Sequence, residues 1–302
     1  MGTILINSFG LFVIIFFGFL VKRVGLLSKV DGDTLSRIII NVTLPAAVLV
    51  NLQKLTVHVN LLFLILAGFL LNLLMVVVGN LLSKKQTTTE REFIMYCGSG
   101  YNIGNFALPF LQSFLPQAIP FLSFFDIGNS IMLAGGTNVA VDNLVGDERE
   151  KPNLFSIVKR LGTSVPFMCY LVMFILRSFS IDLPASFFQI MQPIANANAF
   201  LSMFVIGLYL ELRLPKKDFS VVVRLLSIKY FFGIIIAVIF FLLPLPNLVK
   251  VVLCLVSVGP IPMFGVVNSA KAGMPQEVIG FSSSLSFLIS LPLMTAMLLF
   301  ML

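Results

Sequence analysis

Charged side chains are scarce in this sequence. Only 11% of the 302 residues are Asp, Glu, Lys or Arg, whereas 58% are hydrophobic and the mean hydropathy is +1.04. A soluble domain of this size would not need so apolar a composition, which excludes the ordinary soluble classes. We therefore predict an all-α polytopic membrane protein.

Histidine and cysteine are also rare. His58 is the single histidine and lies in a predicted outside loop, so Ser/His catalysis and His-ligated zinc each lack a component. Cys97, Cys169 and Cys254 fall singly within hydrophobic segments, without the spacing of a metal site or a disulfide framework. We expect no enzyme, no cofactor and no metal site.

Ten hydrophobic segments are long enough to cross a bilayer, which takes about 20 mostly apolar residues. They are 2–21, 34–52, 61–82, 93–115, 121–141, 161–180, 185–211, 220–243, 248–271 and 279–301. Five segments lie on each side of the longest linker, so an internal repeat must have inverted topology. The predicted units are a first inverted repeat at 1–141, a cytoplasmic linker at 142–160 and a second inverted repeat at 161–302.

Basic residues follow the positive-inside rule. With the N-terminus outside, 17 of the 20 Lys and Arg residues fall in cytoplasmic loops or adjoining helix ends, and Lys54, Arg177 and Lys250 lie outside. We expect a multi-pass protein of the plasma membrane with both termini outside. The net charge of +7 then reflects orientation and not nucleic-acid binding. Lys229 and Arg37 are expected to snorkel to the cytoplasmic interface.

Helix-breaking residues interrupt two segments near their centres. The first break is Gly100-Tyr101-Asn102-Ile103-Gly104-Asn105 with Pro109 close behind, and the second is Gly259-Pro260-Ile261-Pro262. In hydrocarbon such breaks survive only where they are buried in protein or line a polar cavity. Paired breaks at matching positions of two halves point to a transporter's binding site. Pro45 and Pro193 are 148 residues apart, and Pro109 and Pro260 are 151 apart, which indicates a duplicated unit.

The second halves of both broken helices would begin near the membrane midplane. Two helix N-termini there favour an anion such as a carboxylate without any buried Lys or Arg. Amides at the same depth can bind a carboxylate or cap freed backbone groups, although they also serve as interhelical glue. The predicted substrate-binding residues are Asn102, Gly104, Asn105, Pro109, Asn41, Pro45, Gln192, Asn196, Pro260, Pro262 and Asn268.

One carboxylate lies clearly within a span. Asp126, with Asn129 one turn further on, is a candidate for coupling to H⁺ or for cation binding, because ionisable residues inside membranes are functional by default. A water-accessible structural carboxylate is the alternative. The carbonyl ends of the first half-helices could also coordinate Na⁺ or lie beside a protonatable group.

Four motifs occur in order along the chain: Arg37-Ile-Ile-Ile-Asn41-Val-Thr-Leu-Pro45, Asn102-Ile-Gly-Asn-Phe-Ala-Leu-Pro109, Phe125-Asp-Ile-Gly-Asn129, and Ser282-Ser-Ser-Leu-Ser286 leading to Pro292. Together they resemble the auxin efflux carrier family in its short bacterial form, the malate or organic-acid permease type. The resemblance implies a fold similar to bile acid sodium symporters, with two inverted five-helix repeats and helices 4 and 9 crossing at the substrate. It further implies elevator-like alternating access, with segments 1, 2, 6 and 7 as scaffold and homodimer side.

The resemblance also bears on the substrate. Plant members export indole acetate, and bacterial relatives are linked to malate, malonate and other small carboxylates. We therefore expect a secondary transporter of a small organic anion, working as a uniporter or coupled to H⁺ or Na⁺, with membrane lipid and a second copy as partners and no nucleic acid. The alternatives are a cation or proton exchanger on a related fold and a membrane sensor that does not transport.

Overall fold

Helices make up every regular element in the described part of the chain. A computed structural model describes residues 2–55, 60–146, 153–213 and 218–302. His58, the predicted outside-loop histidine, lies outside these ranges. The prediction of an all-α membrane protein is confirmed, because seven helices are long and apolar enough to span a bilayer and one bent pair can form an eighth span.

Five spans are continuous helices: α1 (Gly2–Arg23), α4 (Asn60–Ser83), α11 (Ala185–Tyr209), α12 (Phe219–Leu242) and α15 (Gln276–Met301). Two further spans contain a π-helical turn. One is α2 (Lys29–Ile38), η1 (Ile39–Thr43) and α3 (Leu44–Asn51), and the other is α7 (Ile119–Ile131), η4 (Met132–Gly136) and α8 (Thr137–Val145), preceded by the short η3 (Pro116–Ala118).

Two segments are interrupted where the sequence predicts breaks. In the first, α5 (Thr88–Gly98) is separated by residues 99–102 from η2 (Ile103–Ala107) and α6 (Leu108–Phe114). In the second, residues 258–262 separate α13 (Asn247–Ser257) from α14 (Met263–Lys271). Each helical piece of these two segments is too short to cross a bilayer by itself.

The sixth predicted segment differs from the expectation of one span at 161–180. The chain instead forms α9 (Leu154–Thr163), whose first turn is capped by the Asn153 side chain, and α10 (Val165–Ser178), with a bend of 82° between them. Pro166 lies in the first turn of α10, the one position of a helix that tolerates proline well. Part of the predicted linker is therefore a helix.

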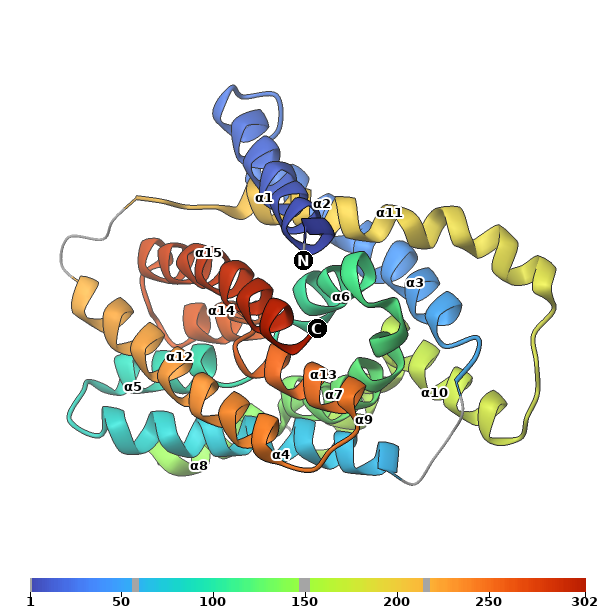
Figure 1. Cartoon of the computed structure of the whole chain (residues 1–302). Helices are drawn as coiled ribbons and strands as arrows, with labels where there is room; N and C mark the ends of the chain where they lie inside the picture. The colour runs from blue at the N-terminus through green and yellow to red at the C-terminus, as the bar shows by residue number, and fades with distance from the viewer. Residues whose placement is uncertain (1, 56–59, 147–152, 214–217) are drawn as a thin grey trace.

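Two groups of helices are visible in Figure 1. In the first, α1, α2 and α3 pack on α11, and α10 packs on α3. The second contains α4, α5, α7, α8, α12, α13, α14 and α15. Glycines allow the closest approaches in both groups: a Cβ on Gly207 would overlap the Ile15 carbonyl, and one on Gly128 would overlap the Ile65 carbonyl.

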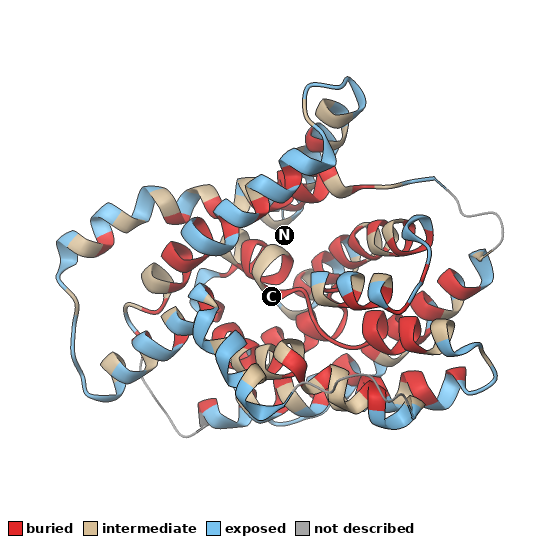
Figure 2. Cartoon of the chain, turned by 180° about the vertical axis from the view of Figure 1, so that it is seen from behind, coloured by how far each residue is buried: buried red, intermediate tan, exposed pale blue. Residues whose placement is uncertain are grey.

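Burial follows the same arrangement. Buried residues concentrate on α5, α7, α13 and the segments around the two breaks, while the outer faces of α1, α11 and α12 are exposed (Figure 2). The exposed side chains on these outer faces include large apolar ones such as Phe9, Ile190 and Phe231. Apolar faces of this kind are suited to contact with lipid. Polar side chains are needed in the interior, where they can bond the backbone groups that the two breaks leave without helical partners.

Candidate functional site at the two helix breaks

The first break is held by a side-chain amide from α7. The Tyr101 N–H donates to Asn129 Oδ1 at 3.2 Å, and Asn129 Nδ2 donates to the Tyr101 carbonyl at 3.1 Å. Asn72 of α4 donates to the same Oδ1 at 3.1 Å. Both backbone groups of the buried Tyr101, which lack helical partners, are thereby satisfied.

A buried lysine lies at the C-terminal end of α5. The Lys229 ammonium donates to the Gly100 carbonyl at 3.3 Å and more weakly to the Gly98 carbonyl at 3.5 Å, and it lies 5.7 Å from the centre of the Tyr101 ring. The residue is only 2% exposed. The prediction that Lys229 snorkels is therefore wrong, because free carbonyls and the negative end of the α5 dipole stabilise the ammonium inside the protein.

The second break is held by hydroxyl groups from α15. Ser286 Oγ accepts from the Ile261 N–H at 3.1 Å, and Ser290 Oγ donates to the Val258 carbonyl at 2.7 Å. Tyr230 of α12 donates to the Ser286 carbonyl at 2.7 Å and contacts Ser290 Oγ at 2.9 Å. Each break is thus fixed by polar side chains of neighbouring spans.

The two breaks touch each other. Asn102 Nδ2 donates to the Ile261 carbonyl at 3.2 Å, and Asn102 is only 8% exposed. Gly100 has φ = 73°, and a Cβ there would lie 3.0 Å from Pro262 Cγ. Asn102 directly precedes η2 and Ile261 lies two residues before α14, so the N-terminal ends of both second halves adjoin.

A pocket opens beside this junction. Its described lining residues are Lys29, Asp33, Asn102, Tyr209, Ile261, Met263, Val266, Gly280, Ser283 and Phe287. They come from both breaks, from α14 and α15, and from the ends of α2 and α11. Of the predicted binding residues, Asn102 is the one in this lining.

Several other predicted residues lie close to the junction. Pro260 and Pro262 are buried within the second break, and Pro109 is buried in the first turn of α6. A Cβ on Gly104 would lie 2.8 Å from Leu44 Cδ2, next to the buried Pro45 at the start of α3. Asn105 Oδ1 is buried and has no hydrogen-bond partner in the described part of the chain.

Four predicted amides are not brought to the pocket. Asn41 is exposed and donates to the Arg37 carbonyl. Gln192 and Asn196 are exposed and bond each other at 2.8 Å on the outer face of α11. Asn268 accepts from Asn138 at 3.1 Å and lies beside a different cavity.

Asp126 is connected to the first break through Asn129. Its carboxylate accepts from Asn129 Nδ2 at 2.9 Å and from the Tyr170 hydroxyl at 3.0 Å, and the residue is 8% exposed. Asp126 does not line the pocket described above. The carboxylate therefore orients the amide that holds Tyr101, and its coupling role stays a prediction.

The predicted site residues do not include Lys229 at the first break, Ser290 and Tyr230 at the second break, or Lys29, Asp33 and Tyr209 in the pocket. Lys229 lies within an apolar span, which is a sequence signal for a buried charge, but the sequence prediction places its ammonium at the cytoplasmic interface of the membrane. Nothing in the sequence places α2 and α11 against α15, so the three pocket residues could not be foreseen.

The helices and the paired breaks define a multi-pass integral membrane protein. Residues 3–142 match the family model described as membrane transport protein. This match supports the resemblance to the auxin efflux carrier family over the matched residues, and together with the membrane-spanning helices it supports a membrane transporter. The matched residues include the first break and Asn129, whereas the second break lies outside the match. No curated protein matches the chain.

Proposed function

We propose that this transporter is a secondary carrier that moves a small organic anion, a carboxylate, across the plasma membrane. The observation that carries the proposal is the hydrogen bond from Asn102 to the Ile261 carbonyl, which joins the two breaks beside a pocket. Two helix N-termini adjoin there, and each carries roughly half a positive charge. The Asn102 amide adds a donor that needs no charge of its own.

The proposed architecture is ten spans in two inverted five-helix repeats, with the broken helices fourth and ninth. The supports of the breaks agree with this arrangement. The first break is held by Asn129 with Asn72, from the fifth and third spans, and the second by Ser286 with Tyr230, from the tenth and eighth. The third and fifth spans of the first repeat and the corresponding eighth and tenth spans of the second would thus each support the broken helix of their own repeat.

The proposed mechanism is elevator-type alternating access. The pocket lies between the two helix groups: Lys29, Asp33 and Tyr209 come from α2 and α11, whereas Asn102, Ile261 and Ser283 come from the breaks and α15. A substrate held at the breaks would move with the second group past the first. The group containing α1, α3, α10 and α11 would be the scaffold and the homodimer side.

Coupling to sodium is disfavoured by Lys229. The carbonyls of Gly98 and Gly100 are the ones that a cation at the C-terminal end of α5 would need, and the ammonium already bonds both. A second positive charge there would be repelled in a region of low dielectric. The same ammonium argues against the cation-exchanger alternative.

We therefore expect carboxylate uptake to be the same, within about twofold, when Na⁺ on both sides is replaced by choline. Initial rates in proteoliposomes containing the purified chain measure this, with an imposed proton gradient as a separate arm. A tenfold or larger loss of uptake without Na⁺ would contradict the role given to Lys229.

The function itself is tested by a panel of labelled acetate, succinate, citrate and benzoate offered to proteoliposomes. The proposal expects saturable uptake of at least one member into the vesicle lumen, absent from protein-free vesicles. Binding without accumulation would instead indicate a sensor. Transport of cations alone would indicate an exchanger.

A further inference from the structure

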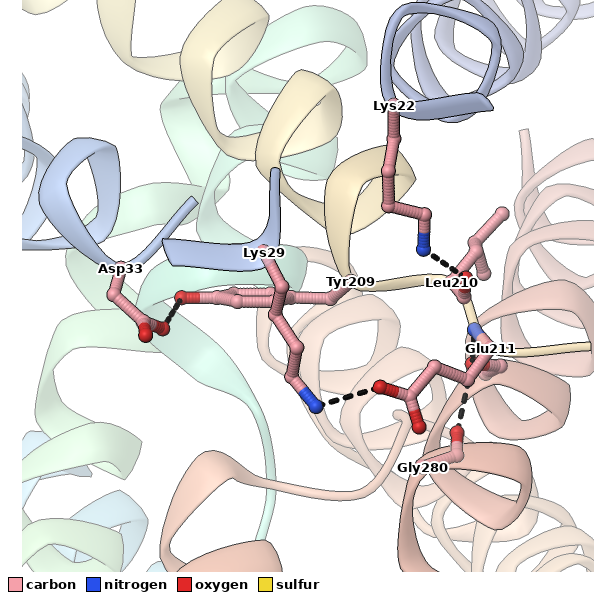
Figure 3. Close-up of polar contacts among 8 residues, drawn as sticks. Lys22, Lys29, Asp33, Tyr209, Leu210, Glu211 and Gly280 are labelled. Atoms are coloured by element: carbon pink, nitrogen blue, oxygen red, sulfur yellow. Dashed lines mark hydrogen bonds and ion pairs between the residues drawn. The ribbon is translucent and has the colours of Figure 1, made fainter. Parts of the chain in front are cut away.

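An ion pair lies beside the pocket. Lys29 is the one Lys or Arg among the described lining residues, and its ammonium bonds Glu211 Oε1 at 2.6 Å. Figure 3 shows the two side chains reaching toward each other from α2 and from the segment that follows α11. The pair therefore links α2 to the chain directly after α11.

Glu211 packs against α15. Its backbone N–H donates to Ser284 Oγ at 2.7 Å, and its Cδ lies 2.7 Å from where a Cβ of Gly280 would be. A side chain at position 280 would displace this carboxylate from its present place. Two residues beyond Ser284, Ser286 accepts the Ile261 N–H of the second break. The ion pair thus joins α2 to the helix that supports the substrate junction.

The other charged groups near the pair are already engaged. Asp33 accepts from the Tyr209 hydroxyl at 2.8 Å, and that hydroxyl also contacts Ser36 Oγ at 2.9 Å. Lys22 donates to the Leu210 carbonyl and does not line the pocket. Lys29 is therefore the cation placed to meet an anion that enters the pocket.

From this arrangement we infer that Lys29 is an anion-selecting residue of the pocket, held by Glu211 when the pocket is empty and transferred to a carboxylate of the entering substrate. The side chains of Lys29 and Glu211 are 52% and 31% exposed, and an ion pair so hydrated contributes little stability, so its exchange costs little. Transfer releases the Glu211 carboxylate from α2, while the Glu211 backbone N–H stays bonded to Ser284 of α15. The inference rests on the proposed function, because it names a second contact for the same carboxylate.

The test compares KM and kcat for the panel member that wild-type proteoliposomes take up fastest. Lys29→Gln is expected to raise KM about tenfold, because a charge-assisted hydrogen bond is lost. Glu211→Gln is expected to lower KM about threefold, because Lys29 no longer has a competing carboxylate. Lys29→Arg keeps the charge and should stay within about twofold of wild type.

Two controls separate substrate binding from a structural role. Lys22→Gln removes a charge of the same sign beside the same segment but outside the pocket, and its KM should be unchanged. The exchange K29E with E211K rebuilds the pair with its ends reversed, and its KM should stay as high as that of Lys29→Gln. Gel filtration confirms that each variant is folded.

Restoration of wild-type KM by the reversed pair, or equal losses from Lys29→Gln and Glu211→Gln, would overturn the inference and leave the proposed function standing. No uptake of any carboxylate by the wild-type chain would overturn the proposed function, and the inference with it.

Discussion

Replacing Asn102 with alanine is expected to lower carboxylate uptake about 100-fold. The side chain donates to the Ile261 carbonyl and lines the pocket, so the variant loses both the bond that joins the breaks and an amide facing the substrate. A hydrogen bond to a charged group contributes about 1.5–3 kcal/mol, and most of this loss would fall on binding and transport. Initial uptake rates in proteoliposomes measure the effect.

Asn41→Ala is the matched control for Asn102→Ala. Asn41 was predicted to bind substrate by the same reasoning, but its amide is exposed and bonds only the Arg37 carbonyl among the contacts described. Its removal should leave uptake within about twofold of wild type. If Asn102→Ala folds and transports at the wild-type rate, the substrate site lies elsewhere.

Replacing Lys229 with methionine is expected to lower uptake about 100-fold while changing overall stability little. Two buried carbonyls lose their donor, at about 1–3 kcal/mol each, but the variant is also relieved of a buried charge whose desolvation costs several kcal/mol. These opposing contributions are of similar size. The local consequence remains, because the backbone at Gly98 and Gly100 loses its contact with the ammonium and the first break keeps only the Asn129 support.

The uptake rate of Lys229→Met should therefore fall about 100-fold, while its thermal unfolding temperature should shift by only a few degrees. Lys250→Met, in the first turn of α13, is the control: its ammonium lies 5.6 Å from the centre of the Phe241 ring, about two helical turns before the second break, and little change is expected. Normal uptake by Lys229→Met would show that the ammonium is dispensable at the break.

Both breaks could be predicted from the sequence because glycine and proline act locally. Gly100 takes a positive φ that other residues rarely adopt, and Pro260 and Pro262 cannot continue α13. The all-helical, membrane-spanning character was equally accessible from composition. What holds the breaks was not, since Lys229 meets carbonyls about 130 positions away in sequence.

Depth in the membrane can be estimated from sequence, but the direction of a side chain around its helix cannot. Gln192 and Asn196 are four residues apart and share the exposed face of α11. Asn198, on the other face, is buried and bonds Thr43 and Gln112. Amides of one type at nearly one depth therefore divide between surface and interior, and only packing decides which is which.

Counterflow in proteoliposomes tests the central claim most directly. Vesicles loaded with an excess of the unlabelled carboxylate are diluted into a trace of the labelled one, without any ion gradient. A carrier whose single site at the breaks faces each side in turn should accumulate label transiently above its equilibrium level, and the Asn102→Ala variant should not. Label that rises only to equilibrium, with no overshoot in the wild-type chain, would contradict alternating access at this site.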